Sequence, residues 1–303
     1  MRDHIANAGE KHLGNFSSIK RRPDERVYIS GQKQRHALFA AMDRLNEGQN
    51  GTYISNGDGV TTVVEKDLRA DLGGYLDTAK ESYSGRRTAP LTATPAVALE
   101  PSKIGQDLLI RLKVTADESS RGQALATREY SQSDDMVMSF HIDVGAVSIR
   151  RLHTYDKEKH IETHFVKHCD EEERRRRIAL AIEASGCLTD YANNARNATS
   201  AEPSHVLIVF DTRISRKAAR FFSSETTERE RALMLNEIRD RGGVYFHGDD
   251  KDEKQDSVAQ AYQKALNFLC DKANPLFDPS NGAEIKSTAD FEGALKPTKK
   301  ASK

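Results

Sequence analysis

The sequence predicts an α+β protein with a ferredoxin-like or RRM-like βαββαβ core. Apolar residues recur at helical spacing in two stretches, and further short stretches carry the alternating or continuous apolar pattern of strands. These elements follow the βαββαβ order once the polar stretches between them are set aside as insertions. The predicted elements are a weak strand at 2–6, a helix at 30–46, strands at 90–99 and 137–150, a helix at 170–186 and a strand at 205–210.

The helix predicted over residues 30–46 begins in a way that favours an anion. Ser30 is the natural N-cap, but Lys33 stands where a capping box would have Glu or Gln, so a cation lies at the positive end of the helix dipole. A phosphate held by free N–H groups, by Lys33 and Arg35 and by residues 20–22 would remove this conflict. A capped amphipathic helix with a solvated lysine explains the same pattern, and the residues alone leave both interpretations open.

The charge distribution indicates a local rather than a general affinity for polyanions. The chain carries 46 Lys and Arg against 46 Asp and Glu, which argues against a uniformly basic nucleic-acid-binding protein. Between residues 11 and 44, however, eight cationic side chains stand against three acidic ones. We therefore predict a basic patch on an otherwise balanced surface.

Hydropathy and cysteine usage exclude several protein classes. No apolar run approaches the ~20 residues that a membrane helix needs, and residues 1–15 lack the apolar core of a signal peptide, which predicts a cytoplasmic location. Cys169, Cys187 and Cys270 are unclustered and form no CxxC motif. Neither a disulfide framework nor a zinc ribbon is expected.

The stretches outside the core also predict local structure. Residues 56–59 are typical of a hairpin turn between strands at 52–55 and 60–64. A long polar excursion follows the strand at 90–99, with strand-like alternation over 104–114 and a loop over 116–135. The remaining predictions are a helix at 65–76, a helix at 226–239, a strand at 244–246, a helix at 255–271 and a disordered tail from 281 to 303.

Three histidines form the one grouping that suggests a metal. His160, His164 and His168 are spaced so that a helix would align them on one face, as a neutral-imidazole site requires. No HExxH motif is present, and the neighbouring lysines would repel a cation. A solvated connector is the favoured interpretation.

The run of four arginines at 174–177 allows two interpretations. It resembles a nucleic-acid-binding patch, but a helix distributes four consecutive side chains around its circumference. Acidic residues at 170–173 directly precede the run and suit the helix N-terminus. We favour a solvated helix face.

Several motifs, taken together, resemble a known family. In chain order they are Asn15-Phe16, Lys20-Arg21-Arg22, Tyr28-Ile29-Ser30-Gly31-Gln32, Arg35-His36-Ala37-Leu38, a stretch at 67–76 that begins Asp67-Leu68-Arg69, Arg86-Arg87-Thr88-Ala89-Pro90-Leu91, and Phe140-His141-Ile142-Asp143-Val144-Gly145. Their order and spacing, over roughly residues 7–210, resemble the DevR-type backbone subunit of type I (I-B-like) CRISPR Cascade complexes.

The resemblance implies both an organisation and a role. The organisation is a single RRM-like palm domain over residues 1–280, with a finger insertion at about 47–85 and a thumb insertion at about 100–136, the thumb being a β-hairpin that reaches over the guide RNA of the adjacent subunit. The role is non-catalytic: copies polymerise along a CRISPR guide RNA and form the backbone of a complex that recognises target DNA. Neither a cofactor nor a membrane is implied.

The implied partners and site residues follow from the same resemblance. The partners are the guide RNA, target DNA through the guide, other copies in a helical filament, a small end-capping subunit, a large subunit and a guide-processing endonuclease. The expected RNA-binding residues are Asn15, Lys20, Arg21, Arg22, Ser30, Gln32, Lys33, Arg35, His36, Arg86, Arg87, Asn194 and Arg196. The expected thumb residues are Lys103, Arg111, Lys113, Arg121 and Arg128.

Two enzymatic alternatives remain open from the residues. Related backbone subunits of type III complexes cleave RNA with an Asp in the loop after the first strand, whereas that loop here offers Asn7, Glu10, Asn15 and Ser17. Asp24 lies much nearer the helix than that Asp does in the family. The second alternative, ranked lower, is a metal-dependent hydrolase built on the three histidines.

Overall fold

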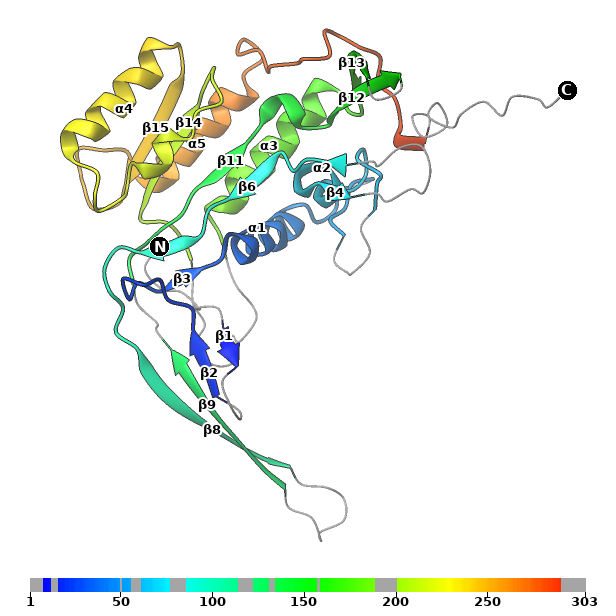
Figure 1. The fold of residues 1–303 in the computed structure, drawn as a ribbon. Helices are drawn as coiled ribbons and strands as arrows, with labels where there is room; N and C mark the ends of the chain where they lie inside the picture. Colours follow the sequence, from blue (N-terminus) through cyan, green and yellow to red (C-terminus); the bar gives the residue numbers. More distant parts are fainter. Residues whose placement is uncertain are drawn as a thin grey trace, which may run out of the picture. The chain divides into compact units, whose positions relative to one another are not determined.

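A computed structural model describes most of the chain (Figure 1). The described residues are 8–11, 16–49, 51–55, 61–76, 86–113, 122–130, 134–156, 159–188 and 201–289. They form short helices and small, mostly antiparallel sheets, which confirms the predicted α+β class. In these residues no helix has the length and apolar character needed to span a bilayer.

Contacts within the chain group it into two compact units, each assembled from three segments. Unit 1 comprises residues 1–37, 93–139 and 186–261, and unit 2 comprises 38–92, 140–185 and 262–303. The sequence had predicted one domain over residues 1–280, interrupted by two insertions.

Unit 1 contains two sheets from its first two segments. The strands β1 (Ala8–Lys11), β2 (Phe16–Ile19), β9 (Gly122–Tyr130) and β8 (Gly105–Lys113) form a four-stranded sheet in that order. The strands β10 (Met136–Val137), β7 (Ala96–Ala98) and β3 (Tyr28–Ile29) form a three-stranded sheet. Ile29, Ala96 and Met136 are buried together, one from each strand of the second sheet.

The third segment of unit 1 pairs β14 (His205–Phe210) with β15 (Val244–Asp249) in antiparallel register. The 3-10 helix η2 (Lys217–Arg220) and helix α4 (Glu228–Asp240) lie between them in the chain. Helix α4 begins with a complete capping box, because Thr227 and Glu230 bond reciprocally. β14 is half-buried along its length, whereas its apolar run had predicted a fully buried strand.

The boundary between the two units falls within two helices of the sequence. Helix α1 (Gly31–Leu45) begins in unit 1 and ends in unit 2, and α5 (Val258–Cys270) does the same. Leu38, Ala41 and Met42 of α1 are buried, as the apolar spacing predicted, whereas Leu45 on the same predicted face is 38% exposed. Phe39, which was not assigned to that face, is also buried.

Unit 2 contains α3 and three two-stranded sheets. Helix α2 (Leu68–Gly73) leads into β4 (Tyr75–Leu76), which pairs with β5 (Arg86–Arg87). The strand β6 (Leu91–Ala93) pairs with β11 (Phe140–Ile142), and the 3-10 helix η1 (Val144–Ala146) follows. β12 (Ile149–Asp156) and β13 (Lys159–Lys167) form a hairpin, and α3 (Glu171–Ser185) comes next.

The helices agree with the sequence predictions better than the strands do. The expected helices at 30–46, 170–186, 226–239 and 255–271 are confirmed as α1, α3, α4 and α5. The expected strand at 90–99 is interrupted at Thr94 and Pro95, and the expected strand at 137–150 divides into β11, η1 and the start of β12. Pro95 has no backbone N–H to donate to a neighbouring strand, which explains the first of these two breaks. The helix predicted at 65–76 is shorter, and Gly74 leaves it with a positive φ of 70°.

Other strand predictions were wrong for the described residues. No hairpin joins 52–55 to 61–64; instead Tyr53 bridges Asp67 in parallel. The loop expected at 116–135 contains β9, which pairs with β8 as the resemblance implied. The RRM-like βαββαβ arrangement stays a prediction, because its expected first strand at 2–6 lies outside the described residues.

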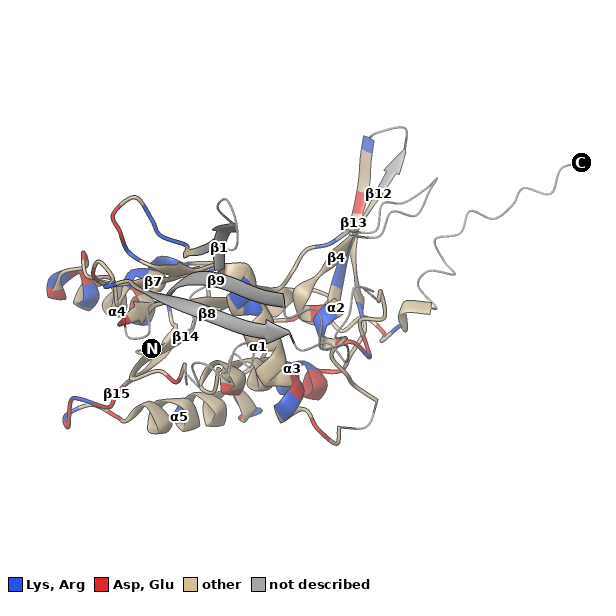
Figure 2. Ribbon diagram, turned by 90° about the horizontal axis from the view of Figure 1, so that it is seen from below, with Lys and Arg blue, Asp and Glu red and all other residues tan. Residues whose placement is uncertain are grey.

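Three of the four arginines of α3 are buried and Arg176 is half-buried, so the expected solvated helix face is wrong. Figure 2 shows acidic and basic residues following one another along the start of α3. The side chains of Arg174 and Arg177 have no exposed surface, and that of Arg175 is 9% exposed. Arg174 donates to the carbonyls of Val144, Val147 and Phe277, between 2.8 and 2.9 Å. Arg175 donates to Glu171 and to carbonyl groups at 269–274.

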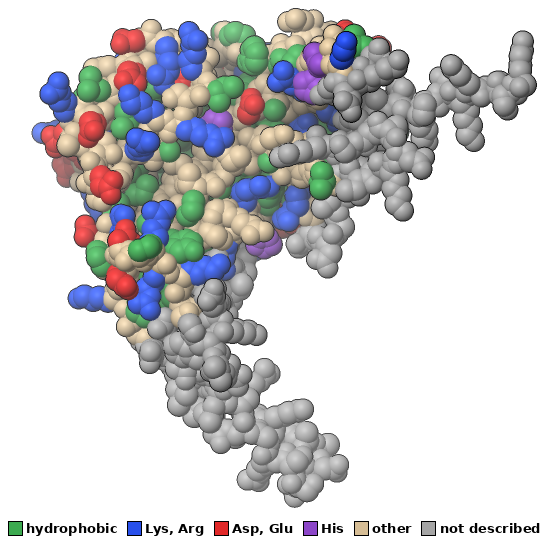
Figure 3. Space-filling view, viewed as in Figure 1, with side chains coloured by type: hydrophobic (Ala, Val, Ile, Leu, Met, Phe, Trp, Pro, Cys, Tyr) green, Lys and Arg blue, Asp and Glu red, His purple; other side chains and the backbone are tan. Residues whose placement is uncertain are grey.

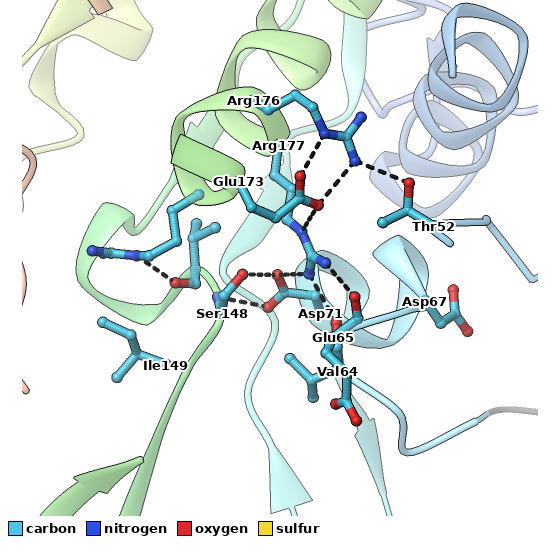
Figure 4. Close-up of polar contacts among 12 residues, drawn as sticks. Thr52, Val64, Glu65, Asp67, Asp71, Ser148, Ile149, Glu173, Arg176 and Arg177 are labelled. Carbon is cyan, nitrogen blue, oxygen red and sulfur yellow. Dashed lines mark hydrogen bonds and ion pairs between the residues drawn. The ribbon is translucent and has the colours of Figure 1, made fainter. Parts of the chain in front are cut away.

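Arg177 belongs to a buried network centred on Asp71 of α2 (Figure 4). It bonds Asp71 Oδ2 at 2.6 Å, and it also donates to the carbonyls of Val64 and Glu65. Ser148 donates its N–H and its hydroxyl to the two Asp71 oxygens, at 2.9 and 2.7 Å. Arg87 bonds Asp71 from the other side. All the lone pairs of a fully buried carboxylate are thus engaged.

The electrostatics of Asp71 follow from these contacts. Burial alone would raise the pKa of Asp71, but the charges of Arg87 and Arg177 and the Ser148 hydrogen bond outweigh burial and hold the pKa below its usual value. The Asp71 charge in turn raises the pKa of Arg177 against the opposing effect of burial. The Asp71 carboxylate and the Arg177 guanidinium are therefore charged in the folded protein.

Residues 278–288 are ordered against unit 2, which corrects the prediction of a disordered tail from residue 281. Lys167 Nζ bonds Asp278 at 2.8 Å, and the Lys286 N–H donates to the Lys167 carbonyl at 2.8 Å. Thr288 is buried; it receives a bond from the Val64 N–H and donates its hydroxyl to Glu65. Residues 290–303 lie outside the described residues.

Replacing Arg177 with Ala is expected to destabilise the protein by about 3–5 kcal/mol, because Asp71 would keep a buried charge with one guanidinium removed. Urea unfolding followed by circular dichroism measures the change. The matched control is Arg229→Ala on the exposed face of α4, which should alter stability by less than about 0.5 kcal/mol. Equal effects of the two substitutions would contradict the network.

Lowering the pH is expected to reduce the folding stability of the protein, because His168 is buried in its neutral form. Burial, with a contribution from Arg150, lowers the pKa of His168 from 6.5 to about 4, and its Nδ1 lies 2.8 Å from the Lys286 carbonyl. The unfolded chain therefore binds a proton that the folded chain excludes between pH 6.5 and 4, so stability falls as the pH falls through that window, by at most about 3 kcal/mol.

His168→Asn retains an N–H donor for the Lys286 carbonyl but does not titrate. In thermal melts across this pH window, we expect the melting temperature of the variant to depend less on pH than that of the wild type. His36→Asn, at an exposed position of α1, is the control. An unchanged slope in the His168 variant would rule out this origin for the pH dependence.

Candidate nucleic-acid interface

The basic residues predicted at 20–22 lie at the start of a tight turn in unit 1. Arg21 and Val27 form an antiparallel bridge, and the Arg22 N–H bonds the Arg26 carbonyl at 2.9 Å. Glu25 closes the turn with a positive φ of 61°. The buried side chains of Ile19 and Val27 pack together with Ile104, the residue that precedes β8. The turn over residues 20–27, which we call the cationic turn, is thus anchored on its apolar side and presents its charged residues to solvent.

Four cations in this turn differ in how they are engaged. Arg21 pairs with Glu25 at 2.9 Å and Arg26 pairs with Asp24 at 2.5 Å. The hydrogen bond from Arg26 lowers the pKa of Asp24. Lys20 is half-buried and Arg22 is exposed, and neither forms an ion pair within the described part of the chain. Since exposed ion pairs contribute little free energy, a phosphate could also exchange for Glu25 at Arg21.

The start of α1 follows the turn and has the predicted cap. The Ser30 hydroxyl accepts from the Lys33 N–H at 3.3 Å, and the first turn contains no acidic residue. Gly31 is required here, because a Cβ would lie 2.5 Å from the Ala93 carbonyl oxygen. Gln32 and His36 are exposed, while Lys33 and Arg35 are half-buried. The helix N-terminus therefore keeps the positive character that the sequence indicated.

Strand pairing connects the turn to the β8–β9 hairpin. β2, which leads directly into the turn, pairs in parallel with β9, with Phe16 opposite Thr127 and Ser17 opposite Arg128 (Figure 1). β8 and β9 pair over nine positions, from Gly105 and Tyr130 to Lys113 and Gly122. The strand that leads into the turn and the predicted thumb therefore belong to one sheet. The sequence did not predict this contact, because residues 16–17 and 127–128 are far apart in the chain.

The structure changes the role of Arg87, which the sequence had placed in the RNA-binding set. Its side chain is 4% exposed and donates to the carbonyls of Ile149 and Ala146 at 3.0 and 2.7 Å, besides its bonds to Asp71. Its donors are engaged inside unit 2, so it stabilises that unit rather than presenting charge to a ligand. The one sequence feature that could have predicted the burial of Arg87 is its partner Asp71, an acidic residue within an otherwise apolar stretch.

The other predicted residues are less fully placed. Lys103 is exposed just before β8. Arg111 and Lys113 lie on β8, Arg128 lies on β9, and Arg86 lies on β5 opposite Leu76. Asn15, Arg121, Asn194 and Arg196 lie outside the described residues.

The histidines lie on a strand and not on a helix, which removes the geometry expected of a metal site. His160 and His164 lie on β13, where residues four apart are roughly 13 Å apart along the strand. His160 bonds Thr163 at 2.7 Å, and His168 contacts the Lys286 carbonyl. Among the described residues, no group of three or more His, Cys, Asp or Glu side chains is arranged to hold a metal ion.

The described surface is mixed in charge. Figure 3 shows Lys and Arg side chains interspersed with Asp and Glu on the face that it draws. This agrees with the zero net charge of the sequence. Any selective affinity for phosphates must then depend on local groups such as the cationic turn.

Comparison with known proteins bears on this geometry. Residues 8–204 match the family described as CRISPR-associated negative auto-regulator DevR/Csa2. A solved structure described as a CRISPR RNA-guided surveillance complex contains a chain with 13% identity and a TM-score of 0.50, covering 88% of this chain and 95% of that one. A second, described as such a complex in a pre-nicking state, contains a chain with 10% identity and a TM-score of 0.52, covering 88% and 97%.

These identities are low, so the two structures establish similarity of fold. The comparison with curated proteins gave no significant match. The family match covers about two-thirds of the sequence and includes the cationic turn, α1, the β8–β9 hairpin and α3. The chain belongs to the DevR/Csa2 family of CRISPR-associated proteins.

Proposed function

We propose that this protein is a non-catalytic guide-RNA-binding subunit whose copies polymerise along the guide to form the backbone of a type I Cascade complex. Membership of a CRISPR-associated family supports a role in a CRISPR system. The fold similarity to chains of RNA-guided surveillance complexes supports a place in such a complex. The other partners of the complex would be target DNA, paired with the guide, and the end-capping, large and guide-processing subunits.

One observation carries the RNA-binding part of the proposal. The turn that exposes Arg22 continues from β2, and β2 shares a sheet with the β8–β9 hairpin. A strand of RNA lying along the turn would therefore also lie beside the base of the hairpin. Contacts from Lys20, Arg22 and the start of α1 would neutralise phosphates without reading bases, as guides of varying sequence require.

The RNA-cleaving alternative is weaker on these contacts. Asp24 lies much nearer the helix than the catalytic Asp of the type III subunits does, and both of its oxygens are bound by Arg26. Its Oδ1 accepts from the Arg26 backbone N–H at 3.3 Å, and its Oδ2 accepts from the Arg26 Nε at 2.6 Å. A general base or metal ligand needs an available carboxylate. The position of His160 and His164 on a strand likewise disfavours a hydrolase built on histidines.

Reversing the charge of Lys20 and Arg22 together, as Lys20→Glu/Arg22→Glu, is expected to weaken RNA binding strongly. Each phosphate that the protein no longer neutralises should lower the salt slope of log K by roughly 0.7, so the slope of the double variant should fall by about 1.4. A filter-binding titration of single-stranded RNA across a salt series gives both quantities.

The matched control is Arg229→Glu/Lys251→Glu, which reverses two exposed cations elsewhere in unit 1. It should bind RNA nearly as the wild type does. Equal losses of affinity in the two double variants would show that only net charge matters, and the site assignment would fail. Lys33→Glu/Arg35→Glu tests the helix start in the same assay.

Replacing residues 105–130 with a short Gly-Ser linker is expected to leave the monomer folded but to prevent its assembly on RNA. The pairs Met136–Ala98 and Val137–Val97 between β10 and β7 do not involve the hairpin and can still form. Size-exclusion mass with and without RNA, together with a thermal melt, tests both expectations. A deletion variant that assembles on RNA like the wild type would exclude a thumb role for the hairpin.

A further inference from the structure

A second cationic surface lies in the loop that follows β14, outside residues 8–204 matched by the family. Its sequence is Asp211-Thr212-Arg213-Ile214-Ser215-Arg216-Lys217-Ala218-Ala219-Arg220. Four of these ten residues are cationic and one is acidic. We call residues 211–220 the arginine loop.

The base of the arginine loop is tied to the end of α4. Asp211 binds the Arg241 guanidinium through two bonds, at 2.8 and 2.5 Å, and accepts from the Arg213 N–H at 2.9 Å. The Thr212 hydroxyl donates to the Arg241 carbonyl at 2.7 Å. These bonds outweigh burial and lower the pKa of Asp211. The only acidic side chain of the loop therefore serves to anchor it.

The three arginines of the loop are not neutralised by the described part of the chain. Arg213, Arg216 and Arg220 are exposed, and none of them forms an ion pair within the described part of the chain. Lys217 pairs with Glu237 at 2.5 Å, but both side chains are close to half exposed. The loop therefore holds three available guanidinium groups within eight residues, on a backbone fixed at its base.

An exposed apolar residue lies between two of these arginines in the sequence. Ile214 is 84% exposed, the largest exposed fraction of any large hydrophobic side chain in the described residues. In the chain it lies between Arg213 and Ser215, with Arg216 next. Isolated exposed apolar residues are common, but this one sits within the cationic tip.

We propose that the arginine loop is a second nucleic-acid-binding site, which takes the phosphodiester backbone of duplex DNA, with Ile214 as a wedge at a base step. Guanidinium groups bind phosphates and enter minor grooves, and apolar side chains between them unstack and bend the duplex. Single-stranded nucleic acid is normally bound by exposed aromatic platforms. The aromatic residues that flank the loop do not offer one, because Phe210 is half-buried and Phe221 is buried. This inference does not depend on guide binding at the Lys20–Arg22 turn.

The test measures binding of the full-length protein to a fluorescein-labelled DNA duplex by anisotropy across a salt series. Arg213→Glu/Arg216→Glu should weaken binding about tenfold or more and lower the salt slope by roughly two, since each neutralised phosphate contributes about 0.9. RNA binding in the filter assay should be unchanged, which separates this site from the proposed guide site. Arg229→Glu/Lys251→Glu serves again as the matched control.

Ile214→Ser tests the wedge separately. It should leave the salt slope unchanged but reduce the bending of a duplex labelled at both ends, measured by energy transfer. Leu233→Ser, an exposed apolar position on α4 with an exposed fraction of 48%, is its control. Arg213→Ala/Arg216→Ala repeats the charge test if the glutamate variant misfolds in a thermal melt.

Several outcomes overturn the proposal. Wild-type protein that does not bind the duplex at low salt, or loop variants that bind like the wild type, would do so. A preference for single-stranded DNA of the same length would reject duplex as the ligand. Competition by polyglutamate at matched charge would indicate a general polyanion surface, and unchanged bending in Ile214→Ser would reject the wedge.

Discussion

A buried carboxylate organises unit 2. Asp71 is completely removed from water, and a charge in that position is tolerated only when it is paired and fully hydrogen-bonded. Arg87, Arg177 and Ser148 supply those bonds from three separate segments. The two guanidinium groups also donate to backbone carbonyls near residues 64–65 and 146–149. One acidic residue thereby fixes the positions of α2, β5, the start of β12 and α3.

Such a network contributes more to specificity than to net stability. Removing charges from water offsets much of their mutual attraction, and a well-packed apolar core could be equally stable. A different register of α3, however, would leave Asp71 or one arginine buried without a partner. The neighbouring arginines extend this constraint, because Arg174 and Arg175 bind carbonyl groups at 144–147 and 269–277. α3 is therefore held to both the preceding and the following parts of the unit.

The features that could be predicted from sequence are those encoded locally. Ser30 caps α1, Thr227 and Glu230 form the capping box of α4, and apolar periodicity marks the buried face of each helix. The burial of Arg177 could not be predicted, because its partner Asp71 lies 106 residues away and the acidic residues before α3 suggest solvent. β9 was missed for a similar reason, since its pairing with β8 and β2 and not its own polar sequence makes it a strand. The cationic turn could be located from charge alone, but its place beside the hairpin required the fold.

The contacts of residues 278–288 with earlier parts of unit 2 have a consequence for biosynthesis. Thr288 bonds Glu65, a residue made 223 positions earlier. At a translation rate of about 5–20 residues per second, roughly 10–45 s separate the synthesis of the two. During that interval the nascent chain carries residues 64–65 without these contacts, so this part of unit 2 is completed only after residue 288 has been synthesised. The order in which segments emerge thus makes the contacts of residues 278–288 a late step in the formation of unit 2, because all four members of the Asp71 network, the last being Arg177, are synthesised before them.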